Sequence, residues 1–156
     1  MKKDFANEMK EWTTKVEIKN EKQCRAIALT LFSKIVKRTP VGNPSLWKSG
    51  KAPKGYVGGR ARGNWWVNYG PGPEAKVTWR VENGQIKGGN ILGKNDTEAQ
   101  AHVMGQLNAF NLANRIWLSN GLPYISRLEY DSWSTQAPNG MVRVSLSEIG
   151  AIVKES

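Results

Sequence analysis

The stretch KDFANEMKEWTTKVEIKNEKQCRAIALTLFSKIVKR, residues 3–38, decides the fold because it predicts one long helix. Its apolar residues recur every three or four positions, the period of one helix face: Phe5, Met9, Trp12, Val16, Cys24, Ile27 or Ala28, Leu31 and Ile35. The region around Asn20 is a possible break that would divide this helix in two. The helix is predicted to end before Pro40, because proline disfavours helical geometry in the residue before it. Cys24 lies in the apolar register, so we expect a buried thiol.

Residues 40–64 predict a long loop that contains three prolines and six glycines. A loop of this length in a small domain is usually functional or ordered by a partner.

The rest of the chain predicts a few short strands and two helices. Strands are expected at residues 64–69, 76–81 and 115–119, and helices at 97–107 and 140–153. Residues 83–95 and 132–139 are rich in turn formers, and Asn120-Gly121 is a tight-turn signal after which 122–128 would pair back as an edge strand. The sequence therefore predicts one α+β domain over 1–156, in which a small antiparallel sheet is packed by a long N-terminal helix and a C-terminal helix. Its parts are a helical region (1–38), a basic loop (40–64), and the strands with the C-terminal helix (65–156).

The net charge of +10 is unevenly distributed. Residues 1–39 carry ten basic and five acidic side chains, residues 65–156 carry eight of each, and residues 40–64 carry basic side chains only. The basic residues of the loop are Lys48, Lys51, Lys54, Arg60 and Arg62. Three interpretations stay open at this stage: a flexible basic loop, a contact with a polyanion such as DNA, or docking on an acidic neighbouring protein.

A search for catalytic and metal-binding patterns finds none with the required spacing. His102 is the only histidine and Cys24 the only cysteine, so the three or four converging ligands of a metal site are not indicated. Glu129 and Asp131 form the closest approach to a carboxylate pair, but we expect them to be solvated or to lie at an interface. The sequence thus predicts no catalytic residue, no cofactor and no metal, and the expectation is that the protein is not an enzyme. An enzyme with an unrecognised site is the less favoured alternative.

Seven tryptophans are many for 156 residues. We expect Trp65, Trp79 and Trp117, which lie in predicted strands, to belong to the core. Trp47 and Trp133 lie in polar, turn-rich segments, and there an interface role is favoured, because aromatic side chains bury a large area with few rotatable bonds.

Two sets of segments together resemble a known family. The first set is Arg38-Thr-Pro-Val-Gly42 with Gly59-Arg-Ala-Arg-Gly-Asn-Trp65. The second is Ile116-Trp-Leu-Ser-Asn-Gly-Leu-Pro-Tyr124, Leu128-Glu-Tyr130 and Ser134-Thr-Gln-Ala-Pro-Asn-Gly-Met-Val142. In this order they resemble the neck and tail-completion proteins of tailed bacteriophages. The chain departs from that pattern by a long insertion between Val41 and Gly59 and by added residues at 83–95.

The resemblance implies a small α+β subunit that forms a ring, commonly sixfold, where the capsid portal meets the tail, without catalytic residues. We therefore expect a structural virion protein: a hexameric ring beside the portal or head-completion proteins and the tail-tube or tail-terminator proteins, with non-specific contact to viral DNA. The expected location is the neck of the virion, and the host cytoplasm during assembly. The sequence has no run of 18 apolar residues and predicts no contact with a membrane. The alternatives are a tail terminator subunit and a free-standing basic module that binds nucleic acid.

Overall fold

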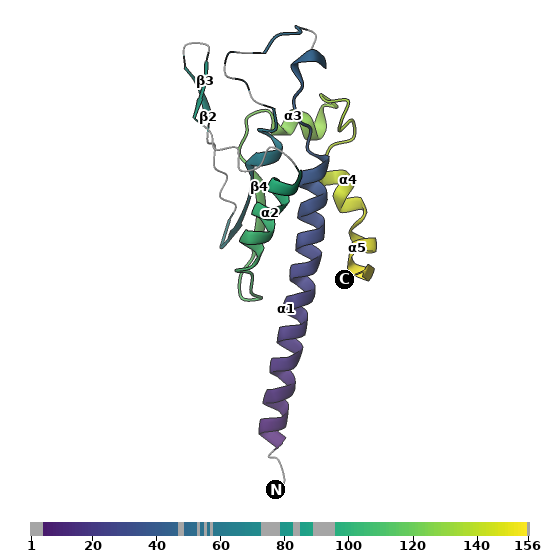
Figure 1. The fold of residues 1–156 in the computed structure, drawn as a ribbon. Coiled ribbons are helices and arrows are strands. Elements are labelled where there is room, and N and C mark those ends of the chain that lie inside the picture. The colour runs from purple at the N-terminus through teal and green to yellow at the C-terminus, as the bar shows by residue number, and fades with distance from the viewer. Residues whose placement is uncertain are drawn as a thin grey trace.

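The chain folds as a body of short elements gathered around one end of a long helix (Figure 1). The computed structural model describes residues 5–46, 49–52, 54, 56, 58–72, 79–82, 85–88 and 96–155. Its helices are α1 (Phe5–Arg38), α2 (Asp96–Leu107), α3 (Ile125–Tyr130), α4 (Val142–Ser147) and α5 (Ile149–Glu155). Its strands are β1 (Trp65–Tyr69), β2 (Trp79–Glu82), β3 (Gln85–Gly88) and β4 (Ile116–Asn120). The predicted α+β class is confirmed.

Helix α1 runs without interruption through Asn20 and ends where the sequence predicts. Thr39 closes its last turn, because the backbone N–H of Thr39 donates to the carbonyls of Ile35 and Val36. Lys37 and Arg38 stand in this turn, where positive charge is favourable beside the helix carbonyls. Pro40 then prevents continuation of the helix.

The strands form two separate antiparallel pairs. β1 pairs with β4 so that Trp65 faces Asn120 and Tyr69 faces Ile116, which confirms the strands expected at 64–69 and 115–119 to within one residue. β2 pairs with β3, and β2 overlaps the strand expected at 76–81 over residues 79–81, while residues 76–78 lie outside the described residues. β3 was not predicted, because Gln85-Ile-Lys-Gly88 has only one apolar residue and no alternating pattern. The remaining residues of the turn-rich segment 83–95 lie outside the described residues.

The core lies between the last third of α1, strand β1 and helix α2. From α1 it takes Ala28, Phe32, Ile35 and Val36. These pack with buried side chains from the rest of the body: Ala61, Trp65, Val67, Val103, Leu107, Leu122, Leu128, Ala137 and Met141. Trp65 is therefore a core residue as predicted, while Trp117 is half-buried, with its indole N–H bonded to the carbonyl of Gly70 at 2.9 Å. The side chain of Trp79 lies outside the described residues.

Two predicted elements after β4 are wrong. Residues 122–128 do not pair back on β4. Instead the Asn120 side-chain oxygen accepts the N–H of Leu122 at 3.2 Å, and a turn leads directly into α3. The single final helix is divided at Glu148, whose N–H returns to Ser145 and whose carboxylate binds Lys34 and Arg38 of α1. These two cations lower the pKa of Glu148.

Candidate assembly surfaces

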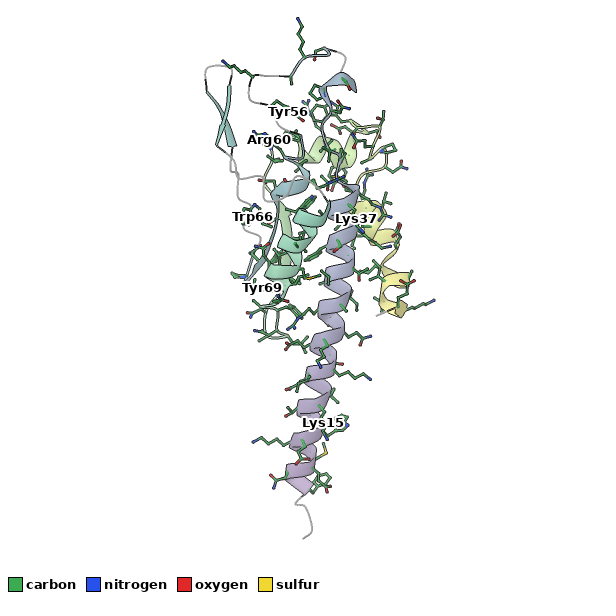
Figure 2. All side chains as sticks on the ribbon, viewed as in Figure 1. Lys15, Lys37, Tyr56, Arg60, Trp66 and Tyr69 are labelled. Atoms are coloured by element: carbon green, nitrogen blue, oxygen red, sulfur yellow. The ribbon has the colours of Figure 1, made fainter. Side chains whose placement is uncertain are left out.

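The N-terminal part of α1 is the largest exposed feature of the fold. We call residues 5–24 the arm; it extends away from the body, and side chains such as that of Lys15 spread around it (Figures 1 and 2). The body begins at Arg25, which donates to the carbonyl of Phe110 at 2.8 Å. At about 1.5 Å per residue the arm is roughly 30 Å long. Cys24, expected as a buried thiol, is exposed because it lies in the arm.

The arm carries apolar side chains that nothing in the described chain covers. Phe5 is 74% exposed and Trp12 60%, and Met9 and Ile18 are also exposed. We call Phe5, Met9, Trp12 and Val16 the arm stripe. With about 100° of rotation per residue, its four members lie within about 60° of one another on the helix.

The arm stripe and the core face of α1 point in different directions. The core face is formed by Ala28, Phe32, Ile35 and Val36. Counting about 100° per residue, the two faces are roughly 150° apart around the helix axis. The arm stripe is therefore not a continuation of the core, and the body of the same chain packs on the other side of α1.

A second apolar surface lies on α4 and α5. The C-terminal helix is predicted to pack on the sheet, but its apolar residues Leu146, Ile149 and Val153 are exposed. Because the helix is broken at Glu148, a different side of α4 and α5 faces the body, and Ser145 and Ile152 are the buried residues. We call Leu146, Ile149 and Val153 the terminal stripe. Helices α4 and α5, which carry this stripe, lie on the opposite side of α1 from α2 (Figure 1).

A third surface is aromatic and surrounds α3. Trp133, for which the sequence predicts an interface role, is 57% exposed. Its ring meets Tyr124 edge-on at 6.0 Å, and the Arg127 guanidinium lies 5.7 Å from its centroid. These contacts hold the indole in place, although more than half of the residue is exposed. Burial, with a smaller contribution from Tyr56, raises the pKa of Tyr124 to about 12 despite the nearby charge of Arg60, so this phenol is neutral at physiological pH. Trp47, the other tryptophan expected at an interface, lies outside the described residues.

The basic residues of the loop fall into three groups in the structure. Lys51 and Lys54 are exposed, and Lys48 lies outside the described residues. Arg60 is only 8% exposed and lies in the body (Figure 2). Arg62 donates through Nε to the carbonyl of Thr39 at 3.0 Å and through Nη2 to that of Lys37 at 3.1 Å, so it holds the end of α1. The sequence predicts that these five residues contact DNA or a partner. Of them, Lys51 and Lys54 are the described residues whose exposed side chains are available for such a contact.

Arg62→Ala is expected to lower the free energy of unfolding by about 1–2 kcal/mol, because two carbonyls of α1 lose a charged donor. For a chain of this length the melting temperature falls by roughly 2–8 °C, measurable by circular dichroism. Lys51→Ala is the matched control, with a change within about 0.5 kcal/mol. An unchanged melting temperature for Arg62→Ala would show that the two hydrogen bonds do not stabilise the fold.

The two ends of the segment 40–64 pack on the body, although the sequence predicts a loop throughout, whereas its described residues between 49 and 54 are exposed. Pro40, Gly59, Ala61 and Asn64 are buried, and two 3-10 turns, Pro44–Leu46 and Arg62–Asn64, lie within it. At Gly58 the backbone passes so close to Gly42 that an added Cβ would lie 2.7 Å from its carbonyl oxygen.

Glu129 has a buried structural role, contrary to the solvated or interface role expected from sequence. Its carboxylate accepts the backbone N–H groups of Met141, Val142 and Arg143 at 2.7–2.9 Å, which caps the start of α4. The Arg143 side chain adds a contact at 3.3 Å. Burial alone would raise the pKa of Glu129, but these donors outweigh it and lower the pKa. With both oxygens occupied, the carboxylate is poorly placed to act as a general base. Asp131 is exposed, and the side chain of His102 lies outside the described residues.

The segments that carry the family resemblance meet in one hydrogen-bonded network. The Gln136 amide bonds both backbone groups of Val41, at 3.2 and 2.9 Å. The Trp65 indole N–H donates to the Thr39 hydroxyl at 2.8 Å. The Asn120 amide donates to the carbonyl of Ala61 at 2.8 Å. Residues far apart in the sequence thus depend on one another for their hydrogen bonds.

Comparison with models of protein families, with curated proteins and with solved structures finds no match for this chain. Within the described residues, no group of three or more histidine, cysteine or acidic side chains is placed to hold a metal ion. Nor does any helix in the described part of the chain have the length and apolarity needed to cross a bilayer.

Proposed function

We propose that the protein is a structural subunit of a tailed-bacteriophage neck, a ring-forming tail-completion protein that joins the DNA-filled capsid to the tail. The observation that carries the proposal is the set of exposed apolar side chains on separate surfaces: Phe5, Met9 and Trp12 of the arm stripe, the terminal stripe, and Trp133. Monomeric proteins rarely expose contiguous apolar surface of this kind, and assembly interfaces regularly do.

The arrangement suits a ring because a cyclic assembly needs two different surfaces on each copy. The terminal stripe and the aromatic surface around Trp133 lie on different elements, α4–α5 and the α3 region, so one can meet the other on the next copy. The hydrogen-bonded network among the segments that resemble the neck family adds support, since Gln136 and Val41 belong to two of those segments.

Cryo-electron microscopy of the virus particles that contain this chain, with mass spectrometry of their necks, tests the proposal. We expect a ring of copies, hexameric by the resemblance, between the portal and the tail tube. A ring found on free tails would favour the tail terminator alternative. Absence of the chain from the mature particle would contradict the neck assignment.

The nucleic-acid alternative has a specific observation in its favour, the exposed Lys51 and Lys54 on a chain of net charge +10. Against it, the arm carries four lysines and four glutamates and is therefore neutral. An electrophoretic shift with naked DNA at moderate salt distinguishes the two functions, because tight binding by the monomer is expected only of a DNA-binding module.

A further inference from the structure

We propose that the arm is a self-association site, and that the arm stripe pairs antiparallel with the arm stripe of a second copy of this chain. This inference goes beyond the neck function and does not depend on it, because it concerns the purified chain alone.

The spacing of the arm stripe is that of a two-heptad helix seam. Met9 and Val16 take a positions and Phe5 and Trp12 take d positions. In an antiparallel pair each a residue meets a d residue, so Met9 faces Trp12 of the second copy and Phe5 faces its Val16. Every layer then combines one aromatic ring with one smaller side chain, which allows the two helices to approach closely.

The charges beside the seam select a second copy and its direction. The g positions are Glu8, Lys15 and Lys22, and the e positions are Ala6, Thr13 and Asn20. Antiparallel helices bring g beside g, so Glu8 of each copy meets Lys15 of the other, and the two-fold axis makes this pair twice. Parallel helices bring g beside e and would form no ion pair here, because none of these e residues is charged.

The body of the molecule permits this pairing. In this register Phe5 lies opposite Val16 of the second copy. The body of the second copy begins at its Arg25, nine residues further on, and therefore about 14 Å beyond Phe5 along the helix axis. The core face of α1 is roughly 150° from the seam, so both bodies lie away from it. Phe5 and Trp12 of two copies bury on the order of 600–1,000 Å² at 150–250 Å² per ring, near the smallest specific interfaces. We therefore expect a dissociation constant of roughly 1–100 µM.

The exposed Cys24, the only cysteine, reports the direction of pairing. Spin labels on Cys24 of the wild-type chain would be about 40 Å apart along an antiparallel pair, a separation of 27 residues. A parallel pair in register would place them within about 20 Å, since packed helices lie 8–10 Å apart. We expect the long distance by pulsed electron paramagnetic resonance. A short distance would overturn the proposal.

Sedimentation velocity with matched variants tests the contact itself. Trp12→Glu should weaken dimerisation at least tenfold. Ile18→Glu, at another exposed apolar position of the arm on the other side of the helix, should change it less than about twofold. Glu8→Lys and Lys15→Glu should each weaken the dimer, and the two together should restore it, because the ion pair re-forms with its charges exchanged. Circular dichroism controls for folding, since neither side chain lies in the core. Two outcomes would overturn the proposal. One is a chain that stays monomeric at concentrations above about 100 µM, the weakest dissociation constant expected. The other is a dimer that Trp12→Glu leaves intact.

Discussion

Replacing Glu129 with alanine is expected to lower the free energy of unfolding by about 3 kcal/mol, because three backbone N–H groups at the start of α4 lose a buried charged acceptor. For 156 residues this corresponds to a fall in melting temperature of roughly 6–12 °C, measured by thermal circular dichroism or calorimetry. Glu129→Gln should lower the free energy of unfolding by less, since glutamine has the same shape and keeps one acceptor oxygen. Asp131→Ala is the matched control, because its exposed carboxylate makes no comparable contact, and a change within about 0.5 kcal/mol is expected. Equal losses for the two alanine variants would contradict the capping role.

The pH dependence of the same variants separates charge from packing. The pKa of Glu129 is lowered in the folded state, so its charge stabilises the fold above the unfolded value near 4.3. That contribution is lost as the pH falls through the lowered folded pKa. The difference in stability between the wild-type chain and Glu129→Gln should therefore shrink when titrated from pH 6 to below pH 4. A difference that stays constant would show that packing alone is responsible.

Gly140→Ala is expected to cost about 3 kcal/mol or more, for two independent reasons. Gly140 has φ of +83°, where a side chain costs roughly 1–2 kcal/mol. In addition, an added Cβ would lie 2.6 Å from the carbonyl oxygen of Glu129 and 2.8 Å from its Oε1. The first of these atoms belongs to the backbone, so relief requires movement of α3 relative to the start of α4. Chemical denaturation of the purified variant measures the loss.

Gly150→Ala provides the control for this substitution. Gly150 lies in α5 with open space around its Cα, so alanine there should stabilise by about 0.5–1 kcal/mol. In a Glu129→Ala background the cost of Gly140→Ala should fall but not vanish, because the side-chain clash is removed and the backbone clash remains. A neutral Gly140→Ala would show that these two segments do not approach closely enough to exclude a side chain at residue 140.

The elements that sequence predicted well are those decided by local signals. The end of α1 follows from Pro40, and β1 and β4 follow from short runs of large apolar residues. Local signals do not predict which side of α1 packs against the body. The spacing of apolar residues shows that a helix has an apolar stripe, but it does not show which surface covers that stripe. Helix α1 has two such stripes, on nearly opposite sides. Treating the two as one stripe predicts a buried Cys24, whereas this residue is exposed at the end of the arm.

The residues of the candidate sites were missed where their partners are remote. Arg60 and Arg62 stand in a glycine-rich basic segment that locally resembles a phosphate-binding loop, but Arg62 is 23 residues from the Thr39 carbonyl that it binds. Glu129 caps a helix that begins 13 residues later, unlike a capping box, where the acceptor lies three residues away. The only local hint was Gly140 directly before the apolar run of α4.

The contact between α1 and Glu148 has a consequence for synthesis of the chain. Lys34 and Glu148 are 114 residues apart, so a ribosome that adds about 5–20 residues per second needs roughly 6–23 s to supply the second after the first. Throughout that interval the apolar side chains at the end of α1 are without their last cover from α4 and α5. During translation these side chains therefore stay exposed for many seconds, and in a chain terminated before α4 they would stay exposed permanently.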